Sequence, residues 1–111
     1  MTKLKPVHPG EILKHEFMDA FGLSSSALAK AINVTPTRIN EIVRERRGIT
    51  AETALRLAKY FGVDAQSWMN LQYHYELEVA EQMLANEVAN IQPMLPRYDS
   101  DKGLPAGLPG K

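Results

Sequence analysis

Two short amphipathic segments, joined by only Asn33 and Val34, constrain the fold of this chain more than any other feature. The first, SSSALAKAIN, begins with serines that suit an N-cap and carries apolar residues at helical spacing. The second begins with Thr35 as N-cap and Pro36 at the first helical position. Ala29 is small enough for two helices to cross closely. The pattern therefore predicts two adjacent helices joined by a tight turn, in which Asn33 adopts the left-handed conformation.

Proline, glycine and capping residues mark three further helices. One follows the stretch HPGE and ends near Gly22, one runs from Thr50 to Gly62, and one begins after Asp64 and reaches Ile91. The last contains two successive apolar stripes, which leave open whether it is continuous or bends. No segment favours a strand, so the sequence predicts an all-α fold of five helices. We expect the helix that begins at Thr50 to bury Ala54, Leu55, Leu57, Ala58 and Phe61.

The 111 residues suffice for one domain with its own core. We expect a helical domain at 1–79, a helical extension at 80–92 and a mobile tail at 93–111. The tail holds four of the seven prolines and three of the seven glycines. Such a composition buries too little apolar surface to offset the entropy of ordering. The sequence therefore predicts that structure is concentrated before residue 93.

Charge is divided unevenly along a chain whose net charge is zero. Residues 1–48 carry eight basic and five acidic residues, net +3, whereas residues 49–91 carry two and six, net −4. This division allows a basic end that faces DNA and an acidic end that attracts a basic protein. The absence of cysteine excludes a disulfide framework, and no apolar run suggests export or membrane insertion. We expect a soluble cytoplasmic protein with no membrane partner.

Four of the thirteen basic residues lie between Thr35 and Thr50. In a helix-turn-helix motif the second helix lies in the major groove, where its N-terminal residues reach base edges. Ile39 and Ile42 face the core, so the opposite face is free to read DNA. The predicted base-reading residues are Thr35, Pro36, Thr37, Arg38, Asn40, Glu41 and Arg44. The predicted phosphate-binding residues, in the following loop and at helix N-termini, are Ser24, Ser25, Ser26, Arg46, Arg47 and Thr50.

The segment from Gly22 to Leu77 resembles the lambda-repressor-like (Xre) helix-turn-helix domain. The preceding HPGEIL and the motif W-x-N-L-Q-x-x-Y-x-L from Trp68 to Leu77 make the chain similar to the narrower HigA-type antitoxin group. The resemblance implies a homodimer that binds a palindromic operator in its own operon and neutralises a HigB-type toxin, a ribosome-dependent mRNA endonuclease. This sequence departs from the family at two positions. Asn33 replaces the usual glycine of the turn, and Ser25 replaces a frequent glutamine, which weakens the expectation of a DNA contact at Ser25.

The sequence leaves two alternatives to a DNA-binding antitoxin open. One is a solitary Xre-type regulator without a toxin, and the other is a protein-interaction module whose DNA binding is vestigial. The arginine-rich face could also be a solvated surface on which Glu41 and Glu45 pair locally with arginines. Operator preference over random DNA argues against the protein-interaction module, and a small basic reading frame beside the gene argues against a solitary regulator.

Catalytic and metal-binding functions find no support in the sequence. His8, His15 and His74 lie on separate segments without metal-ligand spacing, and there is no nucleophile motif or glycine-rich phosphate loop. We expect no cofactor, no metal and no enzymatic activity. His8 suits a capping or packing role. Aromatic and apolar residues of the last helix divide between the core, with Trp68 and Leu71, and a dimer contact formed by Tyr73, Tyr75 and Leu77.

Overall fold

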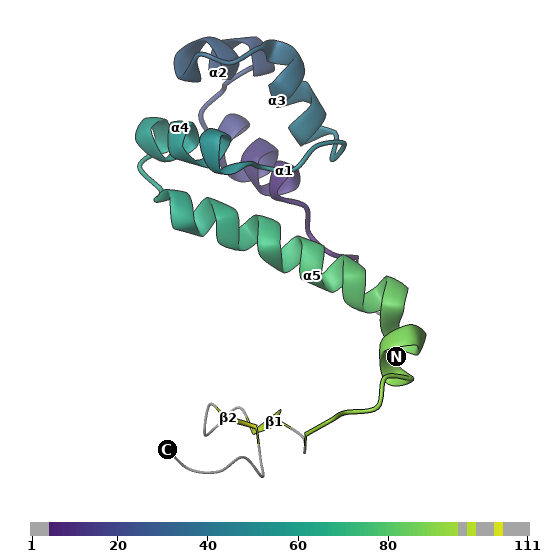
Figure 1. Cartoon of the computed structure of the whole chain (residues 1–111). Coiled ribbons are helices and arrows are strands. Elements are labelled where there is room, and N and C mark those ends of the chain that lie inside the picture. Colours follow the sequence, from purple (N-terminus) through teal and green to yellow (C-terminus); the bar gives the residue numbers. More distant parts are fainter. Residues whose placement is uncertain (1–4, 96–97, 100–103, 106–111) are drawn as a thin grey trace. The chain divides into compact units, whose positions relative to one another are not determined.

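The computed structural model describes residues 5–95, 98–99 and 104–105. The chain divides into two compact units, residues 1–80 and 81–111. Figure 1 shows the helices of the first unit, among them the closely packed pair that the sequence predicts. The expected domain boundaries, after residues 79 and 92, remain predictions.

Five helices account for the helical structure in the described residues, and their order confirms the predicted all-α fold. The first helix has two parts, because a stretch of π-helix continues directly from its opening α-helical turn. The last helix is unbroken, which answers the question left open by its two apolar stripes. The helical segments are α1 (Pro9–Ile12), η1 (Leu13–Met18), α2 (Ser25–Ile32), α3 (Pro36–Val43), α4 (Ala51–Phe61) and α5 (Ala65–Ala89).

The second unit contains the end of α5 and two very short strands. Strand β1 (Tyr98–Asp99) pairs antiparallel with β2 (Leu104–Pro105). The sequence did not predict this pairing, because two residues per strand carry too little pattern to identify a strand. The predicted mobility of the tail falls largely on residues outside the described part of the chain.

Capping side chains define where four of the helices begin. In each case the side chain accepts a hydrogen bond from a backbone N–H two or three residues further on. At the other end, α2 and α4 close on left-handed residues, Asn33 with φ 59° and Gly62 with φ 85°. These observations confirm the predicted starts of α2, α3 and α4 and the predicted ends of α2 and α4. The other two ends fall short of the prediction, since η1 ends at Met18 rather than near Gly22 and α5 ends at Ala89 rather than at Ile91. The four N-caps are His8, Ser24, Thr35 and Thr50.

The core lies where α1, η1, α2, α3, α4 and the start of α5 converge. The prediction for α4 was wrong at one position, since Leu55 is 64% exposed. Successive residues of a helix are rotated by about 100°, so a face centred on Ala54 and Leu57 turns Leu55 outward and Thr53 inward. The buried apolar residues are Leu13, Met18, Leu28, Ala29, Ile32, Ile39, Ile42, Ile49, Ala54, Leu57 and Trp68.

Gly10 explains why the stretch HPGE matters for the position of α3. A Cβ atom at Gly10 would lie 1.9 Å from the carbonyl oxygen of Ile42, near the end of α3. His8 Nδ1 accepts a hydrogen bond from the Gly10 N–H at 2.9 Å, and the imidazole is buried. The close approach at Gly10 means that the first helix packs its backbone directly against α3. The hydrogen bond to Nδ1 confirms the capping role expected for His8.

Candidate nucleic-acid interface

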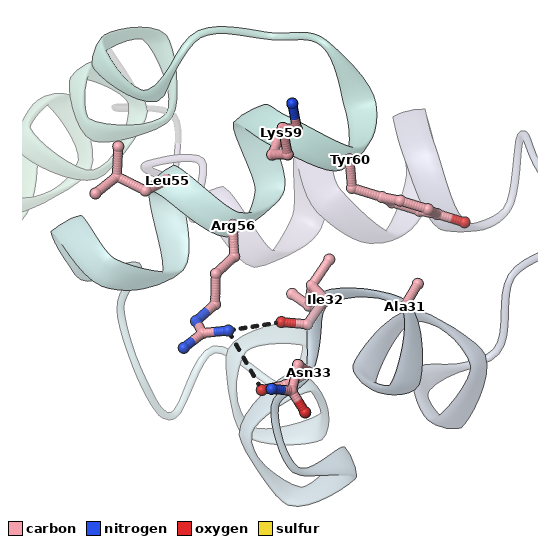
Figure 2. Close-up of a pocket in the computed structure, with 7 residues that line it drawn as sticks. All are labelled: Ala31, Ile32, Asn33, Leu55, Arg56, Lys59 and Tyr60. Carbon is pink, nitrogen blue, oxygen red and sulfur yellow. Dashed lines mark hydrogen bonds between the residues drawn. The ribbon is translucent and has the colours of Figure 1, made fainter.

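The turn between α2 and α3 is held from within the motif and from a neighbouring helix. Within it, the Val34 N–H donates to the Ala29 carbonyl at 2.9 Å. From α4, Arg56 Nη1 donates to the carbonyl oxygens of Ile32 at 3.0 Å and Asn33 at 3.4 Å (Figure 2). Helix C-termini leave carbonyl groups without intrahelical partners, and Arg56 satisfies two of them. Arg56 thus couples the turn, and the direction of α3, to α4.

Helix α3 buries one face and exposes the face predicted to read DNA. Ile39 and Ile42 are fully buried. On the opposite side Thr35, Pro36 and Thr37, which form the N-terminal end, are exposed, as is Arg44 at the C-terminal end. The other three predicted base readers, Arg38, Asn40 and Glu41, are partly exposed. All seven are on or next to one helix, and its N-terminal end is open to solvent.

Two arginines of this surface form ion pairs within the chain. Arg38 Nη1 lies 3.5 Å from Glu52 Oε2 on α4, and Arg47 Nη2 lies 2.8 Å from Glu41 Oε1. Local pairing along the helix at i, i+3 or i+4 is not observed for either glutamate. Glu41 pairs with Arg47 six residues further on, in the loop after α3, and Glu45 lies 3.8 Å from Lys5 Nζ. These contacts link predicted DNA-binding residues to each other and to α4.

Glu52 contacts arginines of two helices, Arg38 on α3 and Arg56 on α4. Arg56 donates to Glu52 Oε2 through Nε at 3.1 Å, and its Nη2 lies 3.0 Å from the same oxygen. The hydrogen bond from Arg56 and the positive charge of Arg38 lower the pKa of the Glu52 carboxyl below its ordinary value. Glu52 is therefore ionised at neutral pH.

The predicted phosphate-binding residues lie at helix N-termini and in the loop after α3. Ser24 caps α2 by accepting from the Ala27 N–H at 3.0 Å, and Thr50 caps α4 by accepting from the Thr53 N–H at 3.3 Å. The hydroxyl acceptors are thus occupied by capping. The first turn of α2 carries no acidic residue, so the positive end of its dipole is available to an anion, whereas Glu52 lies in the first turn of α4. Ser24, Ser26, Arg46, Arg47 and Thr50 are exposed and Ser25 is partly buried.

The loop between α3 and α4 rests on α5. Glu45 has a positive φ of 64°, so the chain turns sharply after α3. Further along, Ile49 N–H donates to Gln72 Oε1 at 2.7 Å, and a Cβ atom at Gly48 would lie 2.7 Å from the Gln72 amide. The glycine therefore makes room for the glutamine, and this contact fixes the path of the loop that carries Arg46 and Arg47.

Sequence reasoning missed three residues that shape this surface, namely Glu52, Arg56 and Gln72. The i, i+4 spacing of Glu52 and Arg56 was a readable signal for an ion pair. Nothing in the sequence indicated that Arg56 reaches the α2 carbonyls, because that contact spans 24 residues. Gln72 stands within the W-x-N-L-Q motif, but its partner Ile49 is 23 residues away.

The predicted dimer contacts occupy different environments on α5. Tyr73 is 56% exposed and Leu77 is 60% exposed. Tyr75 is partly buried, and its ring meets the His8 imidazole edge-on at a centroid distance of 4.7 Å. Trp68 is buried in the core and Leu71 packs against it, as predicted. Tyr75 therefore has a role within the chain, whereas Tyr73 and Leu77 leave apolar surface open.

A groove of about 480 Å³ lies beside the turn, between α2 and α4 (Figure 2). Its lining includes Arg56 and Lys59.

Among the described residues, no three His, Cys, Asp or Glu side chains gather as a metal site would require. In the same part of the chain, no helix combines the length and apolarity needed to cross a bilayer.

The chain is similar in sequence to a helix-turn-helix family model and to named bacterial proteins. A family model described as Helix-turn-helix (HTH_3) matches residues 15–68. Virulence-associated protein I of Dichelobacter nodosus is 62% identical over 81 residues, which cover 73% of this chain and 75% of that protein. Antitoxin HigA-1 of Vibrio cholerae is 31% identical over 93 residues, 84% of this chain and 88% of that one.

A solved structure shares the fold over nearly its whole length. The Pseudomonas aeruginosa antitoxin HigA, solved with the higBA promoter, is 47% identical, with a TM-score of 0.78 over 81% of this chain and 99% of that one. Two of these three relatives are named as HigA antitoxins, and the third is named as a virulence-associated protein. From the helix-turn-helix geometry and these similarities, this chain belongs to the HigA-type antitoxin group of the lambda-repressor-like (Xre) helix-turn-helix family.

Proposed function

We propose that this protein is a homodimeric, sequence-specific repressor of its own operon and the antitoxin of a HigB-type toxin. The observation that carries the DNA-binding part is the exposed end of α3, with arginines around it and its direction fixed by Arg56 and Gly10. The antitoxin part rests on the family and on the acidic residues 49–91, net −4. Such a repressor acts in the cytoplasm and needs no cofactor.

The proposed DNA contacts fall into two classes. Residues of α3 enter the major groove, where Arg38 and Arg44 donate to guanine O6 and N7, Asn40 pairs with adenine and Glu41 accepts from cytosine N4. Thr35, Pro36 and Thr37 supply short contacts at the tip. The phosphate contacts come from the helix N-termini and the loop after α3, and they fix the register on the duplex without reading sequence. Those residues are Ser24, Ser25, Ser26, Arg46, Arg47 and Thr50.

Dimerisation gives the proposed repressor its operator spacing. Two copies related by a twofold axis present their α3 helices to successive major grooves, about 34–36 Å apart. We place Tyr73 and Leu77 in the dimer contact because both expose apolar surface on α5. Tyr75, predicted with them, is partly covered by His8 and would contribute its remaining edge.

The first experiment measures binding to the DNA upstream of the gene and to a scrambled duplex at two salt concentrations. Wild type should prefer the upstream DNA, and the Thr37→Ala, Arg38→Ala double variant should lose that preference. Loss of Arg38 alone should cost about 1–3 kcal/mol and relax one base position, whereas Arg47→Ala should weaken all sequences alike and reduce the salt slope by about one. Lys14→Ala, which removes an equal charge from η1, is the control.

The DNA-binding part and the antitoxin part of the proposal are tested separately. Equal, weak binding of wild type to both duplexes would reject operator reading and favour a protein-interaction module. Toxin binding needs its own test: the product of a small basic reading frame beside the gene should co-purify with the protein and lose its mRNA cleavage. A neighbouring product that cleaves mRNA equally with and without this protein would leave a solitary regulator.

A further inference from the structure

Arg38 has a fixed partner on the proposed DNA-reading surface, and that partner is an acid. Its Nη1 lies 3.5 Å from Glu52 Oε2, and its side chain is only 27% exposed. A free arginine on a DNA-binding surface samples many rotamers and engages any phosphate within reach. Contact with Glu52 restricts the guanidinium of Arg38 to one region between the N-terminal halves of α3 and α4.

Glu52 is itself held by Arg56. One edge of the Arg56 guanidinium contacts Glu52 Oε2, through Nε at 3.1 Å and Nη2 at 3.0 Å. The remaining nitrogen, Nη1, donates to the backbone carbonyl of Ile32 at 3.0 Å. Because the planar guanidinium is rigid, the backbone at the turn fixes Arg56, which in turn fixes the carboxylate.

The contacts form a relay from the helix-turn-helix turn through Arg56 and Glu52 to Arg38. The relay leaves the other nitrogens of Arg38 free to donate, because Glu52 takes only one. Glu52 also remains 57% exposed, so its negative charge faces the solvent that a duplex would displace near the N-terminus of α4. A carboxylate at that place repels any phosphate that comes close to it.

We propose that Glu52 is a specificity-determining positioning residue: it holds Arg38 in base-reading geometry and keeps it from binding phosphate non-specifically. The inference rests on the proposed function, because it takes Arg38 to be a base reader. The lowered pKa of the Glu52 carboxyl agrees with it, since the charged form is the one that both arginines contact.

The test compares wild type with Glu52→Gln on the upstream and scrambled duplexes across a salt series. The variant should bind the scrambled duplex about fivefold more tightly, and its specificity ratio should fall about tenfold. Its salt slope on the scrambled duplex should steepen by about one, because a released arginine adds one phosphate contact. Glu16→Gln on η1 removes an equal charge from an exposed residue and should change neither the ratio nor the slope.

A double-mutant cycle separates positioning from a general charge effect. In an Arg38→Ala background, Glu52→Gln should leave the specificity ratio unchanged, since the residue through which Glu52 acts is gone. An identical factor on both duplexes, or the same fall in ratio with and without Arg38, would overturn the proposal. If Glu52→Gln is unfolded in a thermal melt, Glu52→Asp, which withdraws the carboxylate by one methylene, replaces it and should lower the ratio in the same direction.

The wild-type measurement keeps the two hypotheses apart. Wild type that shows no operator preference contradicts the proposed function itself, and the inference falls with it. Wild type that prefers the operator while Glu52→Gln keeps the full specificity ratio rejects only the role of Glu52.

Discussion

Gln72 on α5 accepts a hydrogen bond from the backbone N–H of Ile49 at 2.7 Å, across 23 residues of sequence. The amide is buried, and its Nε2 donates to Glu76 Oε2 at 2.8 Å. One side chain thus closes the loop that carries Arg46 and Arg47 against the helix that bears the proposed dimer contact. The loop at the candidate DNA surface depends on α5 through this contact.

Replacing Gln72 should therefore destabilise the fold. Gln72→Leu leaves the buried Ile49 N–H without its acceptor, which should cost about 1–3 kcal/mol in the free energy of unfolding. Urea denaturation measures the loss. Gln66→Leu breaks an exposed hydrogen bond to Asn70 on the same helix and should stay within about 0.5 kcal/mol of wild type. Similar losses for both variants would show that the Ile49 contact is not responsible.

Gly10 should tolerate no side chain. In Gly10→Ala the new methyl meets the Ile42 carbonyl, so the first helix must move away from α3, at a cost of about 3 kcal/mol. Gly22→Ala is the matched control, because its new methyl enters open space. Its positive φ of 66° strains an alanine, so the free energy of unfolding should fall by only about 1–2 kcal/mol. Thermal melts of the two variants compare them, and a milder effect at Gly10 than at Gly22 would contradict the close approach.

Two leucines on α4 should differ sharply despite lying two residues apart. Leu57 is fully buried, so Leu57→Ala should cost about 2–5 kcal/mol through lost transfer energy and the cavity left behind. Leu55 is 64% exposed, and Leu55→Ala should stay within about 0.5 kcal/mol. Unfolding free energies from urea titrations decide this, and a large loss at Leu55 would mean that an interface covers it in solution.

Acid should weaken the fold through His8. Burial of the imidazole, partly opposed by the charge of Glu45, lowers the pKa of His8 below its ordinary value of 6.5. Between pH 6.5 and that lower pKa only the unfolded chain gains the proton, so this contribution is fully present above pH 6.5 and is lost as pH falls through the window. His8→Asn keeps a capping acceptor without titrating in this range.

The measurement is unfolding free energy against pH for wild type and His8→Asn. Carboxylates titrate in both proteins, so the difference isolates His8. The unfolding free energy of wild type minus that of His8→Asn should be constant above pH 6.5. Below pH 6.5 this difference should fall, because only wild type loses the contribution of His8. A difference curve that is flat from pH 7 to 5 would mean that the pKa of His8 is the same in the folded and unfolded states.

Local chemistry alone determined much of this protein. Serine and threonine caps, Pro36, Asn33 and Gly62 placed the helix boundaries, because capping and left-handed residues act within a few positions of the chain. Apolar spacing identified the buried faces of α2 and α3. The stretch HPGEIL and the motif from Trp68 to Leu77 identified the family. Leu55 shows the limit of such reasoning: an apolar residue at the edge of a stripe is oriented by what the helix packs against.

Only the tertiary structure decided how the candidate DNA surface is held. Gly10 against Ile42, Arg56 on the α2 carbonyls, Gln72 on Ile49 and Glu52 on Arg38 join residues far apart in the sequence. No periodicity encodes such pairs, since each depends on the angle at which two helices cross and on the reach of one side chain. The sequence thus determined which residues lie on the reading helix, and packing decided what directs it.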